Sequence, residues 1–158
     1  MAAMQDRLWD DYEAHHRAEG NKVCHMLGIP LIIGGLLGLL AIPLAQVGGV
    51  PVEGSLLLLL IAGGIYLWLD IRLGLVMIAF SALIYLGARM LPWPASLGLF
   101  LGGWVFQLIG HGVYEKRSPA FMGNLAHLLV GPLWVLNYLI PLHRSQTLDV
   151  SGKPEVNR

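Results

Sequence analysis

No charged side chain occurs in residues 90–114, which read MLPWPASLGLFLGGWVFQLIGHGVY. The stretch is longer than the roughly 20 apolar residues that an α-helix needs to cross a hydrocarbon core of about 30 Å. Near its end lie Gln107 and His111, and Glu115 follows directly. The i, i+4, i+8 spacing places all three on one helix face. Because polar groups at membrane depth almost always face a bundle interior or a cavity, we expect this face to point inward.

The rest of the chain has the same character. Apolar residues make up 56% of the 158 residues, charged residues only 13%, and the mean hydropathy is +0.64. We predict an all-α integral membrane helical bundle with four to five transmembrane helices, preceded by a short amphipathic N-terminal helix. The predicted spans are residues 26–47, 54–69, 73–91 and 95–114, with a fifth apolar segment at 123–142. We expect one membrane-embedded catalytic domain over residues 1–145 and a polar tail over residues 146–158.

The fifth segment leaves two topologies open. Pro132 and Pro141 favour a bent or re-entrant segment over a full crossing. Lys and Arg gather on the cytoplasmic side of membrane proteins, and Arg7, Arg17 and Lys22 precede the first span. The N-terminus is therefore expected on the cytoplasmic side of the membrane. The membrane would be a bacterial inner membrane, or the endoplasmic reticulum in a eukaryote.

Several function classes are excluded or disfavoured by composition and motifs. A zero net charge with so few charged residues excludes a disordered chain, an acidic tail protein and a basic nucleic-acid binder. The single Cys24 excludes an internal disulfide framework and a CxxC zinc site. The chain has no G-x-S-x-G elbow, Walker loop or HExxH motif. It also lacks the HxxxH and HxxHH clusters of membrane di-iron desaturases and hydroxylases.

Four histidines converge on one edge of the predicted bundle. They are His16 and His25 around the start of the first span, His111 at the end of the fourth, and His127 at the start of the fifth segment. Gly20 can end the N-terminal helix and Asn21 can cap the next helix, which would let His25 face His16. Neutral imidazole is the commonest protein ligand for iron, zinc and copper. The convergence therefore predicts a metal site.

Polar neighbours would orient these imidazoles. The supporting side chains are expected to be Gln107, Glu115 and Asn124. Asp70 could support the site or only end a turn, and His143 is expected to stand apart from the cluster. The alternative interpretation is that the histidines are interfacial, capping helix ends or binding lipid phosphates.

Two motifs carry a resemblance to a known family. The first motif is Tyr12-x3-His16-x4-Asn21-x3-His25-x2-Gly28-x-Pro30. The second is Trp104-x2-Gln107-x2-Gly110-His111-x3-Glu115-x3-Pro119-Ala120. Together they resemble the signature of the membrane 2-hydroxy fatty acid dioxygenases, whose founding member is a fungal endoplasmic-reticulum protein of phytosphingosine breakdown. The resemblance covers about residues 9–135, nearly the whole apolar part.

The resemblance implies an Fe(II) enzyme. It assigns the iron to His16, His25 and His111, with Asn21, Gln107 and Glu115 as supporting residues. His127 is not part of the family pattern, so its place in the site depends on the topology alone. The implied reaction is α-oxidation, the shortening of a 2-hydroxy fatty acid by one carbon with O2. Converting R-CH(OH)-COOH to R-COOH and CO2 releases the four electrons that one O2 accepts, so neither 2-oxoglutarate nor NADPH is required.

Two further hypotheses stay open. A non-catalytic lipid-binding or transport protein would account for the composition but not for the grouped histidines. A zinc-dependent membrane lipid hydrolase would use the same imidazoles without consuming O2. The expected partners are a 2-hydroxy fatty acid, O2 and membrane lipid, with no nucleic acid; the oligomeric state is not predicted.

Overall fold

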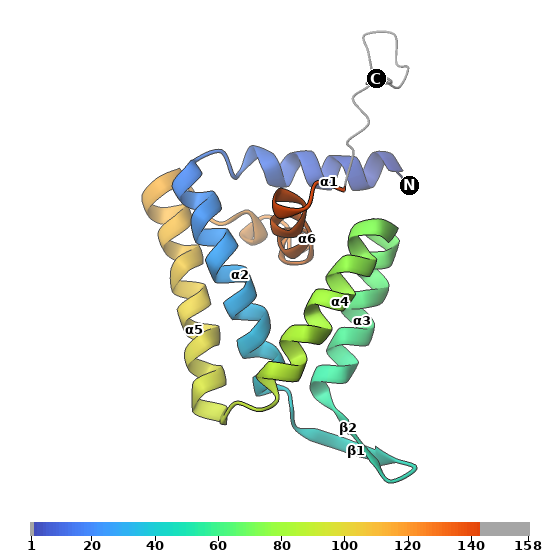
Figure 1. The fold of residues 1–158 in the computed structure, drawn as a ribbon. Helices are drawn as coiled ribbons and strands as arrows, with labels where there is room; N and C mark the ends of the chain where they lie inside the picture. The colour runs from blue at the N-terminus through green and yellow to red at the C-terminus, as the bar shows by residue number, and fades with distance from the viewer. Residues whose placement is uncertain (1, 143–158) are drawn as a thin grey trace.

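The structure is a computed structural model that describes residues 2–142, and most of them are helical (Figure 1). The α-helices are α1 Ala2–Ala14, α2 Glu19–Leu39, α3 Gly54–Leu69, α4 Ile71–Ala88, α5 Trp93–Ile109 and α6 His127–Leu139. A π-helix, Gly110–Glu115, continues α5, and a 3-10 helix covers Ala120–Met122. Strands β1 Pro43–Val47 and β2 Val50–Glu53 form an antiparallel hairpin. The tail 146–158 and His143 lie outside the described residues.

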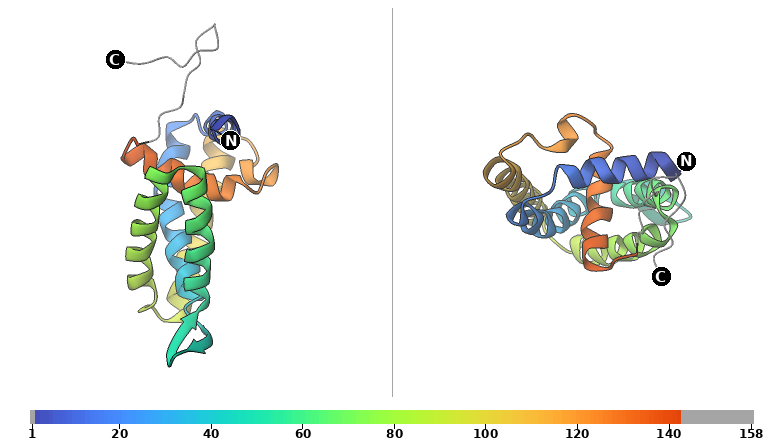
Figure 2. Two further views of the ribbon diagram at one scale, coloured as in Figure 1. Left: turned by 90° about the vertical axis from the view of Figure 1, so that its right-hand side faces the viewer. Right: turned by 90° about the horizontal axis from the view of Figure 1, so that it is seen from above.

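The helices form a bundle with one covered end. Helix α2 packs against α5, and α3 packs against α4 (Figure 1). Helices α1 and α6 lie across the end opposite the hairpin (Figure 2). Segment 123–142 therefore does not run through the bundle beside α2–α5, and α6 covers its end instead.

The predicted number of transmembrane helices was wrong. In the described part of the chain, three helices are long and apolar enough to span a membrane: Glu19–Leu39, Ile71–Ala88 and the continuous Trp93–Glu115. With 16 residues, α3 rises about 24 Å, and with 13 residues α6 rises about 20 Å. Both fall short of a hydrocarbon core of about 30 Å.

The hairpin replaces the end of the predicted span 26–47. Helix α2 ends at Leu39, and the chain then forms two short strands joined at Gly48 and Gly49. Their φ angles are +58° and +81°, as a tight two-residue hairpin turn requires at both central positions. Strand β1 is mostly apolar and fully exposed, so hydropathy alone could not separate it from the helix.

Glycines bring α2 and α5 into close contact. A Cβ atom on Gly103 would lie 2.6 Å from the carbonyl oxygen of Gly28, and one on Gly35 would overlap the backbone of Phe100. Small residues at helix interfaces let two backbones approach in this way. The packing holds the beginning of α2, which carries His25, beside the end of α5.

The N-terminal helix is amphipathic, as predicted. Trp9 and Tyr12 on α1 are buried, together with His16 just beyond its end, while the acidic residues between them are exposed. The predicted break at Gly20 and Asn21 was wrong, because α2 already begins at Glu19 and the chain turns at residues 15–18. Gly20 has a packing role instead, since a Cβ there would overlap the Tyr114 ring.

Asp70 is a helix cap. Its Oδ1 accepts hydrogen bonds from the backbone N–H groups of Arg72 (2.9 Å) and Leu73 (3.0 Å) at the start of α4. Such a cap satisfies donors that the first helical turn leaves unpaired. Of the two roles considered for Asp70, the structure gives it the turn role.

Candidate metal centre and cavity

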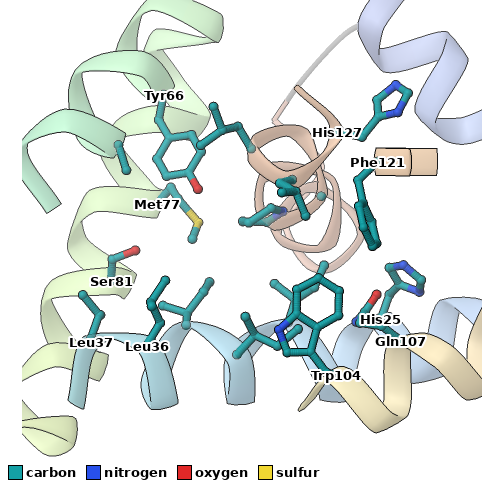
Figure 3. A pocket seen from close by; sticks show the side chains of 18 of the residues that line it. His25, Leu36, Leu37, Tyr66, Met77, Ser81, Trp104, Gln107, Phe121 and His127 are labelled. Carbon is teal, nitrogen blue, oxygen red and sulfur yellow. The ribbon is translucent and has the colours of Figure 1, made fainter. Parts of the chain in front are cut away.

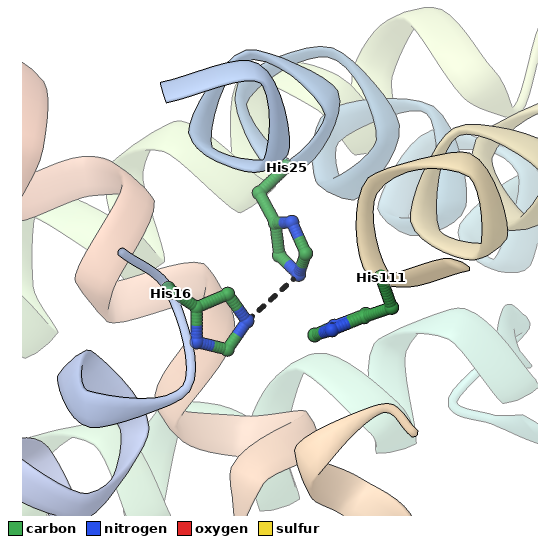
Figure 4. Close-up of side chains that lie close together, drawn as sticks. All are labelled: His16, His25 and His111. Carbon is green, nitrogen blue, oxygen red and sulfur yellow. Dashed lines mark hydrogen bonds between the residues drawn. The ribbon is translucent and has the colours of Figure 1, made fainter. Parts of the chain in front are cut away.

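Three buried imidazoles from separate segments meet at the covered end of the bundle (Figure 4). His16 follows α1, His25 lies in the second turn of α2, and His111 belongs to the π-helix. One ring nitrogen from each lies within 4.8 Å of the others. The ring centroids are 4.4 to 5.0 Å apart and the ring planes are nearly perpendicular. The predicted convergence of these three histidines is confirmed.

Backbone contacts fix the tautomers of two of the rings. Nδ1 of His16 lies 2.6 Å from the carbonyl oxygen of Tyr12, and Nδ1 of His25 lies 2.9 Å from that of Asn21. A carbonyl oxygen only accepts, so each Nδ1 carries the proton and each Nε2 presents a lone pair. This arrangement, with Nδ1 donating to a backbone carbonyl, is typical of metal-ligating histidines.

The two Nε2 atoms then face each other at 3.1 Å, the contact dashed in Figure 4. Two neutral imidazoles in these tautomers place lone pair against lone pair, which a shared cation would relieve. Imidazole nitrogens about 2.0–2.1 Å from one metal ion are themselves roughly 3 Å apart or more. The pair therefore fits a shared metal ion.

The third histidine lacks a polar partner. Nδ1 of His111 is buried and has no hydrogen-bond partner in the described part of the chain. An unsatisfied buried nitrogen costs about 1–3 kcal/mol unless something binds to it. His111 lies in a π-helix, a rare form that is frequent at functional sites.

Burial keeps the site neutral. Desolvation, followed by the proximity of His25, lowers the pKa of His16 to about 3. Burial raises the pKa of the neighbouring Tyr12 phenol well above its usual range. At pH 7 His16 is therefore a neutral imidazole, the form that binds a metal ion.

Two of the predicted supporting residues connect the segments that carry the histidines. Oε1 of Glu115 accepts hydrogen bonds from the backbone N–H of Ala18 (2.7 Å) and from Nδ2 of Asn21 (3.3 Å). Asn21 is fully buried, and its carbonyl holds His25. Glu115 thus ties the end of the π-helix to the turn after His16.

The third predicted supporting residue, Gln107, lies at a cavity instead. Its side chain is buried, and Nε2 has no hydrogen-bond partner in the described part of the chain. It lines a cavity of about 360 Å³ next to His25 (Figure 3). An unpaired buried donor at a cavity wall is placed to bind a polar group of a ligand.

The fourth predicted ligand, His127, stands apart from the three-histidine group. Its Nε2 is 3.0 Å from Oδ2 of Asp11, although the direction is not that of a hydrogen bond. The Tyr12 ring stacks on His16 at 3.9 Å and meets the His127 ring edge-on at 5.8 Å. His127 begins α6 at the same end of the bundle, so the topology placed it in the right region but could not show the intervening tyrosine.

The cavity joins the histidines to an apolar interior. At one end it is lined by the three histidines, Gln107 and His127, and elsewhere almost entirely by apolar side chains of α2, α3, α4, α5 and α6. Figure 3 shows the polar end at His25 and Gln107 and the other end at Leu37 and Ser81. From His25 to Leu37 the α2 axis rises about 18 Å. One leaflet of a hydrocarbon core of about 30 Å is roughly 15 Å deep, so the cavity suits a long acyl chain.

Tyr12 is the main site residue that the metal prediction left out. It holds His16 through its carbonyl, stacks on that ring and lines the cavity. The i, i+4 spacing to His16 was the available signal. The apolar lining of the cavity comes from five helices, and no local pattern could have assembled it.

Comparisons with known proteins identify the family of the chain. Residues 2–142 match the family described as Mpo1-like, 2-hydroxy-palmitic acid dioxygenase Mpo1-like. The chain is 30% identical over 120 residues to the 2-hydroxy-palmitic acid dioxygenase MPO1 of Saccharomyces cerevisiae, covering 75% of this chain and 69% of the relative. No solved structure matches. The chain therefore belongs to the Mpo1-like dioxygenase family.

Proposed function

We propose that this protein is an Fe(II)-dependent dioxygenase that uses O2 to shorten 2-hydroxy fatty acids by one carbon. The observation that carries the proposal is the buried three-histidine group at the polar end of an apolar cavity. The membership of the chain in a dioxygenase family supports the same reaction.

His16, His25 and His111 would hold the iron. His16 and His25 present Nε2 lone pairs because their Nδ1–H groups donate hydrogen bonds to backbone carbonyls. The buried Nδ1 of His111 has no hydrogen-bond partner in the described part of the chain. When bound, Fe(II) supplies the redox chemistry by which O2 reacts with the substrate. Asn21 and Glu115 keep the ligand-bearing segments in register, as described above, and act as positioning residues.

The cavity suits both halves of an amphiphilic substrate. Nε2 of Gln107 would donate a hydrogen bond to the 2-hydroxyl or carboxylate group, since it has no other partner in the described residues. His127, which also lines the polar end, would contribute a second polar contact. The acyl chain would extend along α2 between apolar side chains, where each buried CH2 contributes about 0.8 kcal/mol.

The protein would act from within a membrane. Three helices are long enough to span, and many of their outward-facing apolar side chains are exposed, Leu75, Leu83 and Leu101 among them. Arg7 and Arg17 before α2 and Lys22 in its first turn support a cytoplasmic N-terminus and hence a cytoplasmic metal site. We place it in a bacterial inner membrane or in the endoplasmic reticulum, with residues 1–145 as one catalytic domain.

The test uses the full chain purified in detergent without oxidants and loaded with Fe(II). Adding 2-hydroxy-palmitic acid should consume O2 and yield CO2 and the fatty acid one carbon shorter, in equal amounts. Loading with Zn(II) instead should give no O2 consumption. Ester or amide cleavage by the zinc form would favour the lipid hydrolase, and binding without turnover under both metals would favour a lipid-binding protein.

A further inference from the structure

The cavity ends against a fixed wall far from the histidines. Leu37 of α2 and Ser81 of α4 line this end, and both are buried (Figure 3). Leu58 and Leu59 of α3 complete it. The same leucines belong to a packed apolar group around Tyr85, so the wall has a second layer of side chains behind it.

A polar network around the buried Glu53 anchors this second layer. The Tyr85 hydroxyl donates a hydrogen bond to Oε2 of Glu53 at 2.7 Å, and Arg89 donates to Oε1 of the same carboxylate at 3.0 Å. Glu53 is 7% exposed and ends β2, directly before α3. Because the Glu53 carboxylate is bound by both Tyr85 and Arg89, it fixes the position of the Tyr85 ring relative to the hairpin end of the bundle.

We propose that this wall, at Leu37 and Ser81, selects the length of the acyl chain. The inference rests on the proposed function, since it takes the cavity as the acyl site. Ser81 lies four residues before Tyr85 on the same face of α4, and it is the small side chain in an otherwise leucine-lined end. The space left by this serine sets where the terminal methyl group of the chain can lie.

Two substitutions should shift the selected length in opposite directions. Ser81→Leu fills the end of the cavity, so 2-hydroxy-palmitic acid should lose affinity relative to its shorter homologues. Each methylene that can no longer be buried weakens binding about fourfold, from ~0.8 kcal/mol per buried CH2. Leu37→Ala opens the same end and should shift the preference toward longer homologues.

The matched control is Ala82→Leu, which adds the same kind of volume at the neighbouring exposed position of α4. This variant should keep the wild-type order of affinities. Melting curves in detergent and metal content identify variants that are folded. If Ser81→Leu does not fold, the opposite shift in Leu37→Ala decides the question.

Binding and turnover are measured separately over a series of 2-hydroxy fatty acids of increasing length. Binding is followed by displacement of a fluorescent fatty acid, which needs no catalysis, and turnover by O2 consumption. Opposite shifts in the two variants support length selection. An unchanged order of affinities in both folded variants, or no binding by the wild-type chain, overturns it. Length-dependent binding without any turnover counts against the proposed reaction alone.

Discussion

Replacing Glu115 tests whether the positioning contacts, and not only the histidines, build the metal centre. Two of its hydrogen bonds, from Ala18 and Asn21, end on Oε1. Glu115→Gln keeps this acceptor and removes the charge, which reduces each bond from about 1.5–3 to about 0.5–1.5 kcal/mol. The two reductions add up to about 2 kcal/mol. Because the carboxylate is only half-buried, we expect the free energy of unfolding to fall by about 1 kcal/mol.

Glu115→Ala removes the bonds from Ala18 and Asn21 and leaves the amide of the buried Asn21 without this partner. We expect a loss of about 2–3 kcal/mol in the free energy of unfolding. Metal affinity should fall about 10- to 100-fold, the usual effect of removing a partner of the ligand-bearing segments. Glu115→Gln should lie between Glu115→Ala and the wild type in both measurements.

The assay is anaerobic titration with Fe(II), together with thermal melting of the metal-free protein in the same detergent. The control is Glu19→Gln, which removes an acid from an exposed ion pair with Lys22 and should change neither quantity measurably. Wild-type affinity for Fe(II) together with a wild-type melting temperature in Glu115→Ala would contradict a positioning role for Glu115.

Three further substitutions have defined outcomes. Gly103→Ala pushes a methyl group against the Gly28 carbonyl and should lower the free energy of unfolding by about 1–3 kcal/mol. Gly102→Ala adds its methyl group in open space and should leave the free energy of unfolding unchanged, so equal melting temperatures of the two variants would contradict the close packing. Asp70→Ala removes the cap of α4 and should cost about 1 kcal/mol, which thermal melting would reveal. His127→Gln should keep bound Fe(II) but reduce turnover, and loss of the metal would return this residue to the ligand set.

Hydropathy and charge counting were enough to predict the end of the bundle at which His16, His25 and His111 meet. Each lies at the boundary of an uncharged segment, so the topology alone brings them to one edge. The prediction depends only on successive segments running in alternating directions, so an error of a few residues in the length of a helix does not change which ends meet. The same reasoning placed His127 at this edge but could not foresee Tyr12 stacked on His16.

Other features depend on contacts that a linear pattern does not contain. Strand β1 is apolar enough to fall within the predicted span 26–47, and Gly48 and Gly49 mark the turn that follows it. The sequence predicted Gly20 as a helix end, whereas in the structure the absence of a side chain there lets the Tyr114 ring pack against the backbone. The position of α6 across the bundle is likewise set by tertiary packing, whereas α3 has the bounds 54–69 that the sequence predicted.

The most direct test of the account is Fe(II) binding by the three-histidine group. The full chain and its His16→Ala, His25→Ala and His111→Ala variants are reconstituted anaerobically, and iron is measured after removal of the unbound metal. His15→Ala, a change at the neighbouring histidine outside the group, is the matched control. We expect bound iron in the wild type and in the control, and its loss in all three variants while they remain folded. Full iron occupancy in the three variants would contradict it.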